Sequence, residues 1–130
     1  MKTLGLPRFN SLLEIEGLKS FYDASATNII FNIINHSEIN KIAVPAFICE
    51  EMHLTFLSSN KVIKYYEIDK NMQPILNNEH FDCDCLFLCE YFGLPIIDNK
   101  NLTKFIKNLK KTIIFDRCHS LFSGTKNIDK

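Results

Sequence analysis

The chain has 130 residues, of which 46% are hydrophobic, and its 15 basic side chains balance its 15 acidic ones. This size and composition are typical of one globular domain, or of part of a larger one, and allow a buried core without metal or disulfide support. The zero net charge provides no basic field of the kind that binds nucleic acid or an anionic membrane, so we expect neither as a partner.

No segment of the sequence has the pattern of a signal peptide or a membrane span. The N-terminal segment MKTLGLPRFN lacks a sustained apolar stretch. Nowhere does the chain approach the roughly 18 consecutive apolar residues of a membrane helix. We therefore expect a cytoplasmic protein.

Five cysteines, an odd number, are distributed along the chain. Without a signal peptide they predict reduced thiols rather than a disulfide framework. A shared zinc ion is disfavoured, because Cys83 and Cys89 would lie about 20 Å apart in an extended segment, at roughly 3.3 Å per residue. We expect buried thiols at Cys83, Cys85 and Cys89.

Residues 1–24 and residues 25–130 differ in their patterns. The first segment combines a proline and two glycines with short apolar runs, and we interpret it as an irregular lead-in to a single domain over 25–130. A serine N-cap and isoleucines at helical spacing then predict a helix over 26–36, in spite of the strand preference of β-branched residues.

Four apolar runs in the remaining chain predict strands. They cover residues 41–45, 62–68, 85–91 and 112–116. After the first run, a helical pattern places Met52, Phe56 and Ser59 on one face. The polar segment 69–80 is interpreted as a crossover loop on the surface.

An amphipathic helix is predicted before the last strand. Residues 99–111, NKNLTKFIKNLKK, place apolar side chains on one face and lysines on another. The lysine face suits solvent, with phosphate or an acidic partner as the alternative. Strands that are continuous apolar runs and alternate with helices indicate an α/β fold with a mainly parallel sheet.

Three loops are expected at the carboxyl edge of this sheet, where open parallel sheets bind ligands. They are SAT (25–27), PAFIC (45–49) and DRCHS (116–120). SAT begins a helix whose N-terminal N–H groups suit a phosphate, although a plain helix cap is the competing interpretation. Asp116 either caps the turn after its strand or faces a cationic ligand group. His119 taken alone is more typical of a hydrogen-bonded packing residue than of a catalyst.

Five short motifs in register resemble the large domain of fold-type-I pyridoxal-phosphate enzymes, specifically the DegT/StrS group of sugar aminotransferases. SATNIIFNII is similar to the family's Ser-Gly-Thr/Arg helix start, and IAVPAFIC to its Val-Pro-Ala-Tyr-Thr-Cys strand end. IDKNMQPI, EYFGLP and IIFDRCHS resemble its Ile-Asp-x-x-x-x-x-Ile stretch, its His-Leu-Tyr-Gly-x-Pro turn and its Asp-x-x-Gln/His motif. The resemblance covers roughly residues 21–125 and implies an incomplete large domain.

The resemblance implies a role for each of five residues. Asp116 would accept the protonated pyridine nitrogen of pyridoxal phosphate and so stabilise the ring as an electron sink. Ala26 and Thr27 would contact the cofactor phosphate. Cys49 would flank the ring, and His119 would lie near its phenolic oxygen. Many relatives have glycine at the position of Ala26 and an aromatic residue at that of Cys49.

One residue that the family requires has no match. The Schiff-base lysine lies on a Ser-x-x-Lys-like segment some tens of residues beyond the aspartate, whereas Lys126 and Lys130 follow Asp116 too soon. Glu90 also replaces a frequent histidine. We therefore expect a portion cut before the catalytic lysine, which would hold the cofactor only non-covalently and would not catalyse transamination by the usual route.

The resemblance also implies substrates and partners for an intact relative. An amino donor such as glutamate would transfer its amino group to a nucleotide-linked keto sugar, in a homodimer or together with the missing C-terminal half. A second hypothesis is a non-catalytic α/β binding or interaction domain that kept the scaffold and lost the chemistry. A phosphoacceptor or nucleotide-binding domain is a weaker third, because we find neither an acidic pair near the N-terminus nor a glycine-rich phosphate loop.

Overall fold

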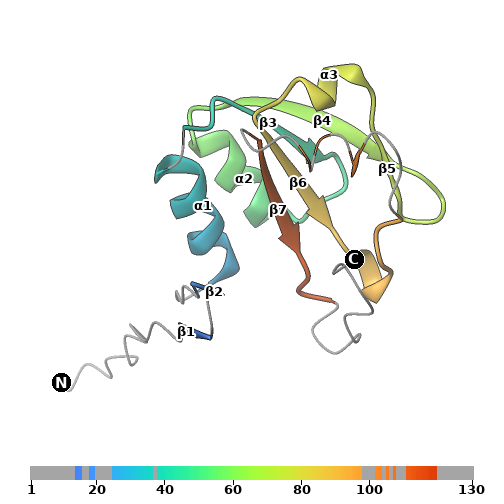
Figure 1. Cartoon of the computed structure of the whole chain (residues 1–130), viewed down its shortest axis with the longest axis horizontal. Coiled ribbons are helices and arrows are strands. Elements are labelled where there is room, and N and C mark those ends of the chain that lie inside the picture. Colours follow the sequence, from blue (N-terminus) through green and yellow to red (C-terminus); the bar gives the residue numbers. More distant parts are fainter. Residues whose placement is uncertain are drawn as a thin grey trace.

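A five-stranded sheet forms the centre of the computed structural model, in the order β5-β4-β3-β6-β7 (Figure 1). The structure describes residues 14–15, 18–19, 25–36, 38–97, 102–103, 105, 107 and 111–119. The strands of this sheet are β3 (Lys41–Pro45), β4 (Val62–Ile68), β5 (Pro74–Ile75), β6 (Cys85–Cys89) and β7 (Thr112–Asp116). β3, β4, β6 and β7 are parallel, while β5 runs antiparallel beside β4. The prediction of an α/β fold with a mainly parallel sheet is therefore confirmed.

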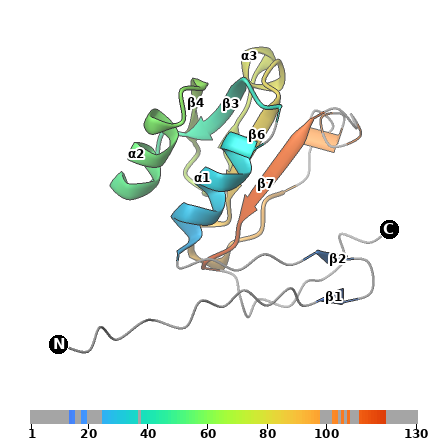
Figure 2. The same cartoon turned by 90° about the vertical axis from the view of Figure 1, so that its left-hand side faces the viewer.

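Two helices cover one face of the sheet (Figure 2). They are α1 (Ala26–His36) and α2 (Glu50–Ser58). Ile30 and Ile34, one helical turn apart in α1, are buried in one cluster with Ile42 and Val44 of β3. Burial of this isoleucine stripe outweighs the strand preference of β-branched side chains, so the helix predicted from residue 26 to residue 36 is confirmed.

A second apolar cluster lies on the other face of the sheet. Ala43 and Leu86 belong to it, together with Leu102 and Phe105, which are helical and almost fully buried. The apolar face predicted for residues 99–111 is therefore buried where the structure describes it. Most of that segment lies outside the described residues.

Two of its lysines differ in environment. Lys107 is exposed, as predicted for a solvated face. Lys111 instead donates hydrogen bonds of 2.9 Å from Nζ to the carbonyl oxygens of Phe81 and Cys83, and its Nζ lies 5.2 Å from the centre of the Phe105 ring. The prediction of a solvated face was thus wrong for Lys111, because backbone carbonyls and an aromatic face receive its ammonium group.

Backbone conformation explains where the third predicted strand ends. The sequence predicts residues 85–91, but β6 ends at Cys89 and a 3₁₀ turn, η1 (Tyr91–Gly93), follows. Phe92 and Gly93 have φ angles of 54° and 78°. These left-handed residues belong to a sharp turn beside the end of β7, and Glu90 and Tyr91, the last two residues of the predicted strand, already form its N-cap and first position.

The polar segment 69–80 contains more regular structure than a crossover loop. Asp69 Oδ1 accepts hydrogen bonds of 2.8 Å from the backbone N–H groups of Asn71 and Gln73. This turn brings the short strand β5 back beside β4. The Asn77 side chain then caps α3 (Asn78–Phe81). The sequence identified the turn-forming residues but not the pairing that the turn permits.

The predicted lead-in over residues 1–24 is described only in part. Within it, β1 (Glu14–Ile15) and β2 (Leu18–Lys19) form a separate two-stranded antiparallel ladder. The prediction of wholly irregular structure was therefore wrong for these four residues. In the described part of the chain, no helix is long and apolar enough to cross a membrane.

Candidate functional site

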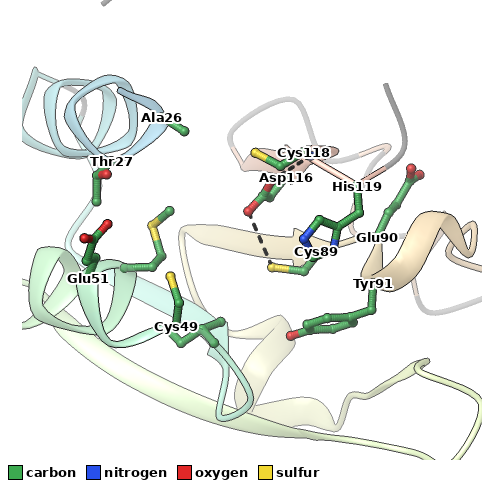
Figure 3. A pocket seen from close by; sticks show the side chains of 12 residues that line it. Ala26, Thr27, Cys49, Glu51, Cys89, Glu90, Tyr91, Asp116, Cys118 and His119 are labelled. Atoms are coloured by element: carbon green, nitrogen blue, oxygen red, sulfur yellow. Dashed lines mark hydrogen bonds between the residues drawn. The ribbon is translucent and has the colours of Figure 1, made fainter. Parts of the chain in front are cut away.

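A cavity of about 290 Å³ lies where the N-terminus of α1, the start of α2 and the carboxyl ends of β6 and β7 meet (Figure 3). Its volume is close to the lower end of the roughly 300 to 1,000 Å³ found for small-molecule sites. All five residues singled out from the sequence line it. They are Ala26, Thr27, Cys49, Asp116 and His119. The carboxyl edge of the parallel sheet thus brings together side chains from three distant segments.

The N-terminus of α1 forms one wall of the cavity. The Ser25 hydroxyl oxygen accepts a hydrogen bond of 3.2 Å from the backbone N–H of Asn28, and the Ser25 carbonyl accepts one of 3.2 Å from Ile29 N–H. Ser25 is therefore a helix cap, as the simpler interpretation predicts. Ala26 and Thr27 follow it and line the cavity, so the positive end of the helix dipole lies at this wall.

Asp116 is the last residue of β7, and its carboxylate accepts hydrogen bonds from two cysteines, Cys118 and Cys89. Oδ1 accepts a hydrogen bond of 3.0 Å from the backbone N–H of Cys118. Oδ2 is the acceptor for the Cys89 thiol, with a distance of 4.0 Å between sulfur and oxygen. The Asp116 carbonyl also accepts a bond of 3.0 Å from Glu90 N–H. Asp116 therefore caps a turn, as one interpretation predicts, and also lines the cavity, as the other requires.

Cys49 lies at the N-cap of α2, with φ and ψ of −67° and 154°. Its side chain makes no capping hydrogen bond, and the residue is exposed. The chain reaches this position from Pro45 through Ala46, whose N–H donates to the Tyr66 carbonyl at 2.8 Å and so extends the β3–β4 pairing. The thiol is therefore available to a molecule in the cavity.

His119 lies in the turn that follows β7 and contacts η1. Its Nδ1 accepts a hydrogen bond of 3.4 Å from Phe92 N–H, and its ring stacks on the Phe92 ring with centroids 6.0 Å apart. A Cβ on Gly93 would lie 3.2 Å from the His119 carbonyl oxygen. His119 thus makes a hydrogen bond and a ring contact with its neighbours, but it is exposed and lines the cavity, so whether it packs or acts in the site stays a prediction.

Sequence reasoning did not assign Glu90 and Tyr91 to the site. Tyr91 donates a short hydrogen bond to the Phe47 carbonyl, and its ring centroid lies 5.5 Å from that of Phe47. Burial raises the pKa of the Tyr91 hydroxyl, so the group stays neutral. Glu90 is 9% exposed and pairs with Arg117, with 3.3 Å between Oε1 and Nε. Glu90 and Tyr91 could have been identified by their position directly after β6, beside the strand that ends in Asp116.

The remaining thiols at the site are held in their neutral form. Burial, followed by the charge of Asp116, raises the pKa of the Cys89 thiol to about 12. Hydrogen bonding to Asp116, followed by burial, raises the pKa of the Cys118 thiol to about 11. All five cysteines are free; Cys83 and Cys85 are buried as predicted, while Cys89 is only partly buried. Among the described residues, no group of three or more potential ligands is arranged to bind a metal ion.

Comparisons with known proteins place the fold. No protein-family model and no curated protein matches the sequence. Solved structures of aminotransferases do match. Aminotransferase AspB from Helicobacter pylori is 15% identical over 71% of this chain, with a TM-score of 0.55. A pyridoxal-phosphate-bound, provisionally assigned aminotransferase from Clostridium difficile is 18% identical over 74%, with a TM-score of 0.54. Histidinol-phosphate aminotransferase from Clostridium acetobutylicum is 20% identical over 69%, with a TM-score of 0.50.

The chain spans 28% of the length of each of these three proteins. Its fold is accordingly that of part of the large domain of fold-type-I aminotransferases. This agrees with the incomplete large domain that the sequence motifs imply.

Proposed function

We propose that this chain is the cofactor-binding part of a pyridoxal-phosphate-dependent aminotransferase of the DegT/StrS type. One observation carries the proposal: a helix N-terminus and a carboxylate form different walls of one cavity, at Thr27 and Asp116. Such a site has an electropositive wall for a phosphate and an anionic group for a protonated ring nitrogen. Pyridoxal phosphate carries both groups on one small molecule.

Each predicted residue has a role in this proposal. Ala26 and Thr27 bind the phosphate at the start of α1, and Asp116 accepts a hydrogen bond from the ring nitrogen. Cys49 lies against the ring from the start of α2, and His119 orients its phenolic oxygen. When bound, the cofactor supplies an electron sink, while these residues bind and orient it and Asp116 holds the proton on the ring nitrogen.

No lysine is among the described residues that line the cavity. We therefore propose that these residues hold the cofactor without a covalent bond, and that amino transfer requires a lysine supplied from elsewhere, either from a longer form of this chain or from a second chain. The motif resemblance supports glutamate or a similar amino donor and a nucleotide-linked keto sugar as substrates, and a homodimer as the assembly.

A titration with pyridoxal phosphate, followed by thermal unfolding and by near-ultraviolet circular dichroism, tests cofactor binding. A ligand at one hundred times its Kd stabilises the folded state by about 2.7 kcal/mol. Asp116→Asn should weaken binding roughly ten- to hundredfold, because it removes a charge-assisted hydrogen bond. Asp82→Asn is the control, since the Asp82 side chain is 76% exposed and does not line the cavity.

A non-catalytic α/β binding domain is the second candidate, and the absence of lysine from the described cavity lining favours it. It predicts that pyridoxal phosphate changes neither the melting temperature nor the dichroism of the wild-type chain. Sequencing the encoding DNA past codon 130 and translating all three forward frames also distinguishes the aminotransferase from the non-catalytic binding domain. A Ser-x-x-Lys segment in frame supports an aminotransferase, whereas its absence from every frame favours the binding domain or a separately encoded half.

A further inference from the structure

Two cysteines donate hydrogen bonds to the Asp116 carboxylate: Cys118 through its backbone N–H and its thiol, and Cys89 through its thiol. The backbone N–H of Cys118 bonds to Oδ1, while the Cys89 thiol reaches Oδ2. Figure 3 shows the contact between Cys89 and Asp116 at the wall of the cavity. Both Cys118 donors come from Asp116's own turn, whereas the Cys89 thiol comes from the neighbouring strand and fixes the carboxylate relative to the sheet.

The sheet register makes this contact a built feature. Cys89 and Asp116 are direct partners in the parallel pairing of β6 with β7. The hydrogen bond from Glu90 N–H to the Asp116 carbonyl continues that pairing by one residue. The two side chains are therefore neighbours because their backbones are paired, and the contact does not depend on a mobile loop.

A thiol has a chemical advantage over a cationic donor at this position. An arginine or lysine beside Asp116 would neutralise the carboxylate and compete with any cationic group of a ligand. The Cys89 thiol stays protonated at neutral pH, because burial and the charge of Asp116 raise its pKa to about 12. It can therefore donate to one oxygen while it leaves the negative charge of Asp116 available to the cavity.

We propose that Cys89 is a positioning residue for Asp116: its thiol, fixed by the β6–β7 register, holds the carboxylate in the orientation that faces the cavity. This inference rests on the proposed function in one respect: the oriented carboxylate would bind a protonated ring nitrogen. The contact itself is a property of the chain alone and can be measured without the cofactor.

The test is a titration of the Asp116 side-chain carboxyl by ¹³C NMR on the whole chain labelled at aspartate, with the signal assigned by its loss in Asp116→Asn. In Cys89→Val, which keeps a similar volume but has no donor, the pKa of Asp116 should rise by roughly 0.5 to 1, as expected when a carboxylate loses one weak hydrogen-bond donor. In Cys89→Ser, which keeps a donor, it should stay within about 0.3 of the wild-type value.

Cys85→Val is the matched control. Cys85 lies in the same strand and is fully buried, but it has no hydrogen bond to Asp116. The proposal is overturned if the pKa of Asp116 is unchanged in Cys89→Val. It is also overturned if this pKa rises as much in Cys85→Val or in Cys89→Ser as in Cys89→Val. If Cys89→Val does not fold, Cys89→Ala replaces it with the same expected rise.

The same samples, titrated with pyridoxal phosphate, separate this inference from the proposed function. If the wild-type chain does not bind the cofactor, but the pKa of Asp116 differs between wild type and Cys89→Val, the proposed function is contradicted and the contact is established. If the wild-type chain binds the cofactor, but the pKa of Asp116 is the same in wild type and Cys89→Val, only the role of Cys89 is contradicted.

Discussion

Glu90 Oε1 lies 3.3 Å from Arg117 Nε, so the residues that follow β6 and β7 are joined by their side chains as well as by the backbone. The Glu90 side chain is 9% exposed, whereas the Arg117 side chain is 35% exposed. The pair lies one residue beyond the contact of Cys89 with Asp116. It therefore stabilises the part of the sheet edge on which the candidate site is built.

Arg117→Met should lower the free energy of unfolding by about 1 to 3 kcal/mol, because it leaves a buried carboxylate without its cationic partner. Urea denaturation at neutral pH measures the loss. Lys41→Met is the matched control: Lys41 pairs with Asp82 at 3.2 Å, but the two side chains are 47% and 76% exposed, and the expected loss is below about 1 kcal/mol. Equal losses in the two variants would show that the burial of Glu90 is unimportant.

Gly93→Ala tests the turn that supports His119. Gly93 has a φ of 78°, and an added Cβ would lie 3.2 Å from the backbone carbonyl of His119. We expect a loss of about 1 to 2 kcal/mol in stability, from the left-handed backbone together with the close contact. Asn60→Gly, at a φ of 56° after α2, is the converse variant and should be neutral or slightly stabilising. A Gly93→Ala protein as stable as wild type would show that this turn does not require glycine.

Local chemistry and hydrophobic patterning were sufficient to predict most elements of this fold. The strand Thr112–Asp116 and the helix Ala26–His36 agree with prediction because burial and capping act within each segment. The sequence could not supply the register between strands. Cys89 and Asp116 are neighbours because β6 pairs with β7, although 27 residues of chain separate them. The hydrophobic pattern within each strand does not predict this pairing.

The end of β6 was missed for a different reason. EYFGLP contains one glycine, which explains a left-handed residue at Gly93, but Phe92 also has a φ of 54°. Bulky residues rarely adopt this conformation, so propensity alone does not predict a turn that begins as early as Tyr91. The stacking of Phe92 on His119 accompanies the turn and joins two segments that are distant in sequence. Contacts of this kind decide a boundary only after the fold has brought the segments together.

Asp84 should make the stability of the fold depend on acid pH. Its Oδ2 accepts hydrogen bonds of 2.9 Å from the backbone N–H groups of Lys41 and Asn40, and these bonds lower the pKa of the Asp84 carboxyl. The unfolded chain has a pKa of about 3.9 at such a group. Because the folded-state pKa is the lower one, this contribution is fully present above the unfolded pKa and is lost as the pH falls through the folded pKa.

Asp84→Asn should therefore be less stable than wild type at pH 7, and the difference should narrow below about pH 4. Urea denaturation between pH 2.5 and 7, at intervals of about half a pH step, measures both chains under one protocol. Asp82→Asn again provides the control, because its exposed ion pair contributes little. A difference that does not change with pH would mean that the hydrogen bonds of Asp84 do not depend on its charge.

Thiol labelling provides a test of the candidate site that does not require activity. Cys49 and Cys118 are exposed at the cavity, whereas Cys83 and Cys85 are buried and should react only on unfolding. Because the thiolate is the reactive species, the raised pKa of Cys118, about 11, predicts that a neutral-pH disulfide reagent modifies Cys49 first.

Excess pyridoxal phosphate should slow the modification of Cys49 if the molecule occupies the cavity. Mass spectrometry of peptides from timed samples, with Cys49→Ser as the control, assigns the order. Faster reaction at Cys118 would contradict the order predicted from its raised pKa, and unchanged reaction of Cys49 in excess cofactor would contradict the placement of Cys49 beside the bound ring.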